Sequence, residues 1–147
     1  LRDMRILGID PGLATVGIAL VEGDSHEPKA LDWFTIETPS NTPLAERLTE
    51  IEDDLSAYIK EQNPDLAVIE KLYFSVNEKT ALDVAQARGV LMATVAKHRI
   101  EIVEPTPPEL KSCISGDGKA DKKQMQKMVK MIFNLQEIPT PDDAAMH

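Results

Sequence analysis

The sequence has little of what marks secreted, membrane-spanning or fibrous proteins. Its single cysteine, Cys113, cannot form an internal disulfide, which is typical of proteins in a reducing cytosol. No apolar run reaches the ~18 residues of a membrane span, and the first residues do not follow the pattern of a secretory signal. Glycine (7) and proline (10) are too few for a collagen-like chain. We therefore expect a globular, cytoplasmic protein without a membrane partner.

Basic residues are also scarce, with 16 Lys and Arg against 25 Asp and Glu and a net charge of −9. This balance argues against a protein that coats nucleic acid through bulk positive charge. The charge is divided, however: residues 1–70 carry a net −10 and residues 71–147 a net +1. Six lysines stand against two acids between Lys111 and Lys130. The second half can therefore still bind a polyanion.

The first half of the 147 residues begins with three short apolar segments, 5–10, 15–21 and 31–37, expected to form an antiparallel meander. Thr42 and Pro43 are expected to be the N-cap and first residue of a helix that ends before Pro64. Apolar residues at helical spacing predict its buried stripe: Leu44, Leu48, Ile51, Leu55 and Ile59.

The second half of the sequence alternates between predicted strands and predicted helices. A strand over 66–70, apolar enough to be central, precedes an irregular segment, and a long helix over 79–98 leads to a strand over 100–103. A short helix around 109–114 and a last helix over 120–133 follow. This order predicts one mixed α/β domain, with a five-stranded sheet of three antiparallel and two parallel strands flanked by helices.

Two acids end strands that are predicted to be central, Asp10 in the first and Glu70 in the fourth. Side chains at strand ends of an open α/β sheet point into a crevice. Together with Asp142 and Asp143 they would form an oxygen-rich site that suits Mg²⁺ or Mn²⁺. Two such ions ~4 Å apart activate a water and stabilise the leaving oxygen in phosphodiester cleavage. Taken singly, each acid also fits an ordinary strand end, loop or helix cap.

The order of five motifs is more specific than any one of them. From Met4 to Ala145, the chain resembles the RuvC-type Holliday-junction resolvases in Ile6-Leu-Gly-Ile-Asp-Pro-Gly12, Ala67-Val-Ile-Glu70, Ala85-Gln-Ala-Arg-Gly89, Gly118-Lys119-Ala120-Asp121-Lys122 and Asp143-Ala144-Ala145. The resemblance implies an RNase H-like fold in a single domain over 1–147 and a homodimer. It also implies Mg²⁺-dependent, symmetric nicking of four-way DNA junctions and cooperation with a RuvA/RuvB branch-migration complex.

The resemblance also assigns roles by position. Asp10, Glu70 and Asp143 match the metal-binding carboxylates, with Asp142 as the neighbouring alternative. Tyr73 and Phe74 match aromatic residues that stack on bases near the junction centre, although such a pair is equally often part of a core. Lys111 and Lys122 match lysines near the scissile phosphate. Lys119 and Lys123 extend a surface that can follow the phosphate backbone. Arg88 and Gly89 are interpreted as helix and dimer packing.

The end of the sequence departs from the family pattern. The pattern continues Asp-Ala-Ala-Asp-Ala-Leu-Ala into a closing helix whose Asp is a metal ligand, whereas Met146 and His147 follow Ala145 here. A thioether is a poor ligand for Mg²⁺. A shortened chain, an inactive natural variant and residues omitted from the sequence are all compatible with this difference.

Alternative functions follow from these observations. One is a catalytically impaired module that binds junctions, and another is an RNase H-like nuclease of the YqgF type that acts on RNA. Gln86-Ala-Arg-Gly89 and the lysine-rich stretch favour the DNA junction nuclease. An actin-like kinase needs a second phosphate loop and a much longer chain.

Overall fold

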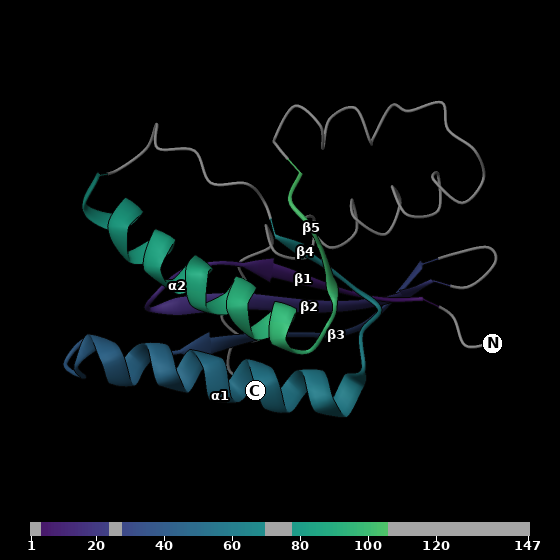
Figure 1. Ribbon diagram of the computed structural model, residues 1–147, viewed down its shortest axis with the longest axis horizontal. Helices are drawn as coiled ribbons and strands as arrows, with labels where there is room; N and C mark the ends of the chain where they lie inside the picture. Colours follow the sequence, from purple (N-terminus) through teal and green to yellow (C-terminus); the bar gives the residue numbers. More distant parts are fainter. Residues whose placement is uncertain (1–3, 24–27, 70–77, 106–147) are drawn as a thin grey trace.

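The computed structural model describes residues 4–23, 28–69 and 78–105, which form a five-stranded sheet with two helices on one of its faces (Figure 1). The sheet order is β3-β2-β1-β4-β5. Strands β1 to β3 are antiparallel neighbours, while β4 runs parallel to β1 and β5 parallel to β4. The bounds are β1 Arg5–Asp10, β2 Thr15–Gly23, β3 Pro28–Glu37, α1 Leu44–Gln62, β4 Leu66–Ile69, α2 Glu78–Lys97 and β5 Glu101–Val103. The predicted mixed sheet is confirmed.

The hairpin of β2 and β3 is longer than the sequence predicted. The pairs Glu22↔Lys29 and Gly23↔Pro28 extend both strands into the segment expected as a loop. A shift of register next to Leu20 and Val21 separates this outer part from the inner pairs. The extension was not predicted because its residues are polar and include Pro28. Backbone pairing, rather than an alternating apolar pattern, holds this outer part of the hairpin.

The hydrophobic core lies between the helices and the sheet face that they cover. Ile51, Leu55 and Ile59 of α1 are buried at a spacing of four residues, as predicted. Ala87, Leu91 and Val95 form the corresponding stripe of α2. They pack on alternate residues of the strands, which include Leu7, Ile9, Val16, Ile18, Ile36, Ala67 and Ile69. Burying each large aliphatic side chain contributes about 1.5–3 kcal/mol to stability.

The start of α1 corrects two predictions. Pro43, not Thr42, occupies the N-cap position, and no side chain caps the helix. The amide of Thr42 instead donates to the carbonyl of Pro39 at 3.2 Å, so Thr42 belongs to the preceding turn. Leu44 is 40% exposed rather than part of the buried stripe, because the first turn of α1 extends beyond the ends of the strands (Figure 1).

The end of α1 is fastened to the start of β1. Asn63 adopts a left-handed conformation (φ 48°) and donates its amide to the carbonyl of Ile59 at 2.8 Å, and Pro64 then ends the helix. The amide of Arg5 donates to Asp65 Oδ2 at 2.8 Å, and the amide of Asp65 donates to the carbonyl of Arg5 at 2.8 Å. The Arg5 guanidinium donates to the carbonyl of Gln62 at 2.9 Å. These bonds fix where β4 enters the sheet beside β1.

The remaining expectations concern other parts of the chain. The irregular segment after β4 and the expected helices over 109–114 and 120–133 lie outside the described residues. Across the portion that the structure does describe, neither helix is long and apolar enough to cross a membrane.

Candidate active site

Asp10 ends β1, which lies in the middle of the sheet between β2 and β4. The preceding residue, Ile9, is buried against the helices, so Asp10 belongs to the opposite face of the sheet. Its partner across the antiparallel pair is Gly17. The predicted position of Asp10 at the end of a central strand is confirmed.

Gly17 provides the space that the Asp10 side chain occupies. A Cβ atom added at Gly17 would lie 3.3 Å from the Cβ of Asp10 and 3.9 Å from its Oδ2. An added Cβ would therefore crowd the Cβ of Asp10, while its contact with the carboxylate oxygen would be an ordinary van der Waals one. Sequence reasoning missed Gly17, although a glycine inside a strand often marks the close approach of another group.

The Asp10 carboxyl is partly desolvated. The residue as a whole remains exposed, but burial on the strand side raises its pKa above the usual value of 3.8. Among residues 4–23, 28–69 and 78–105, no hydrogen bond or ion pair to Asp10 is present. A carboxylate that has lost hydration and has no such partner favours a nearby cation. This environment fits a divalent metal.

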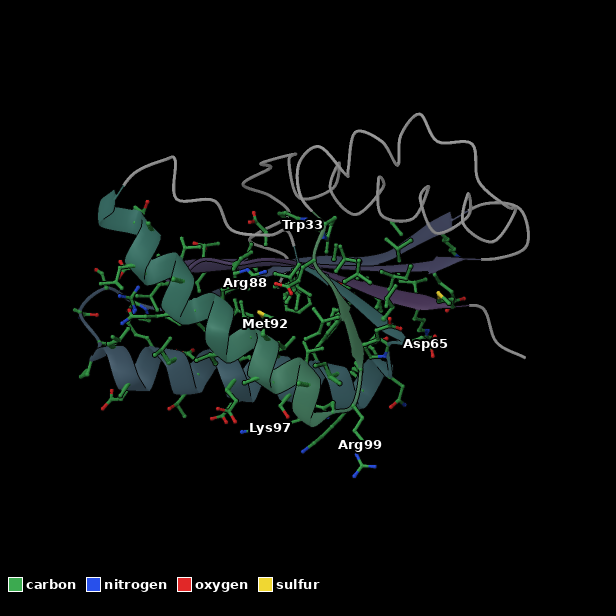
Figure 2. The ribbon with its side chains drawn as sticks, turned by 45° about the horizontal axis from the view of Figure 1, so that its top comes forward. Trp33, Asp65, Arg88, Met92, Lys97 and Arg99 are labelled. Carbon is green, nitrogen blue, oxygen red and sulfur yellow. The ribbon has the colours of Figure 1, made fainter. Side chains whose placement is uncertain are left out.

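Polar groups on β3 share the sheet face of Asp10. Thr35 pairs with Gly17, and Trp33 pairs with Ala19 (Figure 2 labels Trp33). Thr35 Oγ1 and Trp33 Nε1 are buried, and neither has a hydrogen-bond partner within the described segments. Sequence reasoning missed both groups, because no local pattern marks them.

The turn after Asp10 contains Gly12 of the first sequence motif and is held by Thr38 and Arg47, which sequence reasoning missed. A Cβ on Gly12 would lie 2.3 Å from the carbonyl oxygen of Thr15, so the tight turn requires glycine. Thr38 donates its hydroxyl to the carbonyl of Leu13 at 2.6 Å and its amide to that of Ala14 at 3.0 Å. Arg47 of α1 in turn donates to the Thr38 hydroxyl at 3.0 Å. The beginning of α1 thus fixes the loop beside Asp10.

Strand β4 runs parallel to β1 and is described as far as Ile69. Its pairs begin with Ile6↔Leu66 and end with Ile9↔Ile69. The next position, Glu70, lies outside the described residues, as do the other predicted site residues: Asp142, Asp143, Tyr73, Phe74, Lys111, Lys119, Lys122 and Lys123. Correspondingly, in the described part of the chain no three potential metal-ligating side chains come together.

Arg88 and Gly89 were interpreted as packing residues. Arg88 forms an ion pair with Glu104, which follows β5, and donates to the sulfur of Met92 at 3.1 Å (Figure 2). Gly89 is exposed, and a Cβ there would meet no atom within 4 Å. Arg88 therefore connects α2 to the end of β5, while Gly89 leaves part of the outer face of α2 flat.

Comparison with known proteins identifies the family. The sequence model of the family "Crossover junction endodeoxyribonuclease RuvC" matches residues 6–146. The chain belongs to the RuvC family. The RuvC of Halothermothrix orenii is 46% identical over 142 residues, which cover 97% of this chain and 86% of that protein. The RuvC of Alkaliphilus oremlandii is 47% identical, with coverage of 97% and 87%.

The fold agrees with this assignment. The structure of Thermus thermophilus RuvC in complex with a Holliday junction substrate superposes with a TM-score of 0.70 at 22% identity, and covers 97% of this chain and 87% of that one. The RuvC-like, RNase H-like fold expected from the sequence is therefore confirmed. The family match also favours the junction nuclease over the RNA-acting and kinase alternatives.

Proposed function

We propose that this RuvC family member is an endonuclease that nicks four-way DNA junctions symmetrically by Mg²⁺-dependent phosphodiester hydrolysis, in recombination and repair. The observation that carries the proposal is Asp10, a partly desolvated carboxylate at the end of the central strand of an RNase H-like sheet. The relatives are named as crossover junction endodeoxyribonucleases, and the T. thermophilus relative was solved with a Holliday junction.

The proposed metal ligands are Asp10, Glu70 and Asp143, with Asp142 as the alternative. Every described pair of β1 with β4 joins a residue to the one 60 positions later, and Asp10 and Glu70 are separated by the same offset. This relation supports placing the two carboxylates together. A bound Mg²⁺ or Mn²⁺ supplies a Lewis acid that lowers the pKa of a water and offsets charge on the phosphate.

The chain's own residues orient the substrate in this proposal. Asp10 stays ionised to hold the cation, and Gly17 keeps the space beside it open. Lys111 and Lys122 neutralise the scissile phosphate, while Lys119 and Lys123 bind flanking phosphates. Tyr73 and Phe74 stack on bases at the junction centre. Because the acids of α1 are exposed on the other side of the sheet, they do not repel DNA at Asp10.

A homodimer would give two nicks related by symmetry. The outer face of α2 offers an interface of small and apolar residues: Leu82 is 65% exposed, and Gly89, Ala93 and Ala96 are exposed on later turns. Sedimentation of Leu82→Glu should show monomer at concentrations at which the parent chain is a dimer. Leu44→Glu, a matched change of an exposed leucine on α1, should leave the dimer intact. A parent chain that is only monomeric at micromolar concentration contradicts the dimer.

The nuclease proposal is tested with a synthetic four-way junction labelled on each strand in turn. We expect paired, symmetric nicks with Mg²⁺ and none with EDTA, and Asp10→Asn should bind the junction without nicking it. Bound but uncut junction with the parent chain would instead support the binding-module alternative. Preferential cleavage of an RNA–DNA hybrid, or cleavage that persists in Asp10→Asn, would contradict the proposal. Junction affinity should fall with salt and rise with Mg²⁺.

The cellular setting follows from the same proposal. The substrate is chromosomal DNA, and a single cysteine suits a reducing compartment, so we place the protein in the cytoplasm. The resemblance makes a RuvA/RuvB branch-migration complex the expected partner at the junction. Added RuvA and RuvB should then change the rate of nicking.

A further inference from the structure

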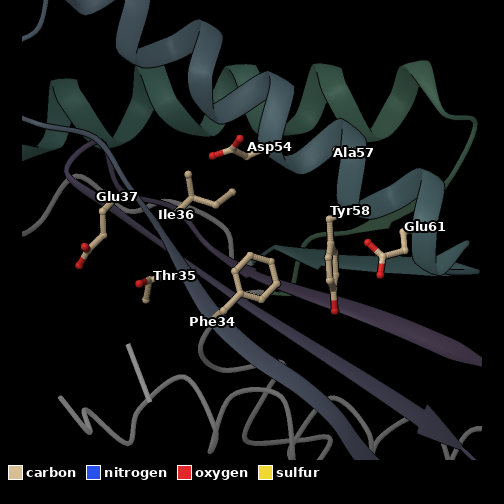
Figure 3. Close-up of a pocket in the computed structure, with 8 residues that line it drawn as sticks. All are labelled: Phe34, Thr35, Ile36, Glu37, Asp54, Ala57, Tyr58 and Glu61. Carbon is tan, nitrogen blue, oxygen red and sulfur yellow. The ribbon is translucent and has the colours of Figure 1, made fainter. Parts of the chain in front are cut away.

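The outermost described strands of the sheet, β3 and β5, are each fastened to a helix. Strand β3 is ten residues long and packs on α1, where the ring of Tyr58 lies against that of Phe34 (Figure 3) and its hydroxyl donates to Asp32 Oδ2 at 3.0 Å. Strand β5 has only three residues, Glu101–Val103, and among the described strands it pairs with β4 alone. Three residues of parallel pairing supply few backbone hydrogen bonds, so the position of β5 depends on other contacts.

Both ends of β5 are attached to α2. Before the strand, Arg99 adopts a left-handed conformation (φ 60°) and donates its amide to the carbonyl of Ala96 at 2.9 Å, which closes the end of the helix. After the strand, Glu104 forms an ion pair with Arg88. The two elements match in length, because a helix rises about 16 Å from Arg88 to Arg99 and an extended chain covers about 16 Å from Arg99 to Glu104. Arg88 is therefore level with the end of β5.

The Arg88 guanidinium is held on two sides. One nitrogen donates to Glu104 Oε1, and another donates to the sulfur of Met92, one turn further along α2, at 3.1 Å (Figure 2 labels Arg88 and Met92). The side chain of Arg88 is 14% exposed and that of Glu104 is 37% exposed. An ion pair this close to solvent contributes little to the free energy of unfolding. Its main effect is to fix the position of the two side chains.

The register of the sheet shows which way the chain turns at this point. Ile9 of β1 pairs with Ile69 of β4, and both are buried against the helices. The pairing of β4 with β5 continues this row to Glu104, which therefore points towards α2. The next residue, Pro105, is buried and follows in the row of Asp10. The chain therefore leaves β5 at the edge of the sheet where Asp10 lies.

We propose that Arg88 is a positioning residue for the nuclease reaction, which holds Glu104 to α2 and so sets where the chain leaves the sheet towards Lys111. This inference rests on the proposed function, in which Lys111 neutralises the scissile phosphate. Three of the four residues after Glu104 are proline. Such a segment is stiff, so a displacement at Glu104 is passed on to Lys111 rather than absorbed. A shift of about 1 Å at a group that acts on the substrate is enough to slow a reaction by up to about a hundredfold.

The test measures single-turnover nicking by variants of the full chain, at saturating four-way junction and Mg²⁺. Arg88→Met removes the charge but keeps a long unbranched side chain, and should slow nicking by about tenfold. Its junction Kd and its sedimentation should match those of the parent chain. Glu104→Gln should be equally slow, and the double variant no slower than either, because both changes remove the same contact. Arg88→Lys keeps the ion pair without the contact to sulfur and should recover part of the rate.

Lys97→Met provides a matched control on the same helix. Lys97 forms an exposed ion pair with Glu52 of α1 at 3.3 Å, so its replacement removes a cation and an ion pair of α2 away from the end of β5. This variant should nick within about twofold of the parental rate. Equal losses in Lys97→Met and Arg88→Met would show a general effect on α2 and overturn the proposal.

A second comparison asks whether Arg88 acts through Lys111. Lys111→Ala should slow nicking in the parent chain and have a clearly smaller effect in the Arg88→Met background, because the lysine is already displaced there. Losses that multiply independently would mean that Arg88 does not act through Lys111, which would also overturn the proposal.

Hydrogen exchange provides a readout that does not depend on nicking. Arg88→Met should speed amide exchange in peptides that cover residues 101–111 and leave peptides from α1 and β2 unchanged. Unchanged exchange over 101–111, or faster exchange throughout the chain, contradicts a local positioning role. A parent chain that does not nick overturns the proposed function and this role together, whereas normal nicking by Arg88→Met beside an active parent overturns the role of Arg88 alone.

Discussion

The hydroxyl of Thr38 donates to the carbonyl oxygen of Leu13 at 2.6 Å, across 25 residues of sequence. The same hydroxyl accepts from Arg47 of α1, so one buried side chain joins the loop after Asp10 to the first turns of the helix. The loop that carries the candidate metal ligand is thereby positioned by the helical layer as well as by β1.

Replacing Thr38 with valine should destabilise the fold by about 1–3 kcal/mol, because the Leu13 carbonyl and the Arg47 guanidinium lose their partner without a change in side-chain shape. Urea denaturation, from which the free energy of unfolding is obtained, measures this loss of stability. Thr38→Ser retains the hydroxyl and should recover most of the loss. Equal stability of the valine variant and the parent chain would show that the two bonds contribute little.

Gly17→Ala should lower the rate of junction nicking by about tenfold to a hundredfold, since its Cβ would lie 3.3 Å from that of Asp10 and displace the carboxylate. Stability should change little. Ala19→Gly, two residues along the same strand face, provides the matched control: it should lose stability and retain nicking at low temperature. Normal nicking by Gly17→Ala would mean that Asp10 tolerates the shift.

Asp10→Asn should abolish nicking and raise the free energy of unfolding at neutral pH in EDTA. Burial raises the pKa of Asp10, so the folded chain holds the proton more tightly than the unfolded chain. Stability therefore falls as pH rises through the folded pKa, and the ionised carboxylate destabilises the fold above it. The asparagine removes this penalty. Added Mg²⁺ should stabilise the parent chain more than the variant.

The outcome that contradicts this account is an asparagine variant less stable than the parent chain at neutral pH. At limiting Mg²⁺, where Asp10 is mostly metal-free, the same raised pKa predicts that protons compete with the cation for this carboxylate at a higher pH than for an ordinary aspartate, so that nicking declines earlier on the acid side. A pH–rate profile of nicking, recorded at a saturating concentration of junction, measures this decline.

Tyr58 should ionise later than an ordinary tyrosine. Burial, the negative charge of Asp32 and the hydrogen bond to it all raise the pKa of the phenol above 10.0. The protonated phenol contributes its full stabilisation below the pKa that tyrosine has in the unfolded chain. The free energy of unfolding then falls as pH rises from there through the raised pKa of folded Tyr58. Absorbance near 295 nm should show a tyrosine ionisation step that is delayed until the chain unfolds, and Tyr58→Phe should remove this step. Absence of a delayed step in the parent chain would contradict the prediction.

Much of the fold was predictable because its elements depend on local patterns. Ile51, Leu55 and Ile59 of the predicted α1 stripe and the apolar run of β4 are buried as their spacing indicated, whereas Leu44 is exposed and Leu48 only partly buried. The position of Asp10 followed from the Pro-Gly turn after a short strand. Thr42 was misassigned because a cap is decided by backbone geometry, and here the preceding turn uses its amide.

The missed parts of the site depend on contacts between distant residues. Gly17 matters only because antiparallel pairing brings it opposite Asp10, and Thr38 only because it meets Leu13 and Arg47. A single sequence contains no direct signal of such pairs. The roles of the carboxylates and lysines beyond the described residues stay predictions.

The parallel pairing of β1 with β4 has a consequence for synthesis of the chain. The antiparallel strands β1 to β3 leave the ribosome first, and until the residues of β4 emerge the inner edge of β1 has no strand beside it. Ile6, Leu7 and Ile9 lie along that edge and are buried in the finished fold. Until β4 pairs with β1, the nascent protein therefore exposes an apolar strand edge, the kind of surface through which incompletely folded chains aggregate.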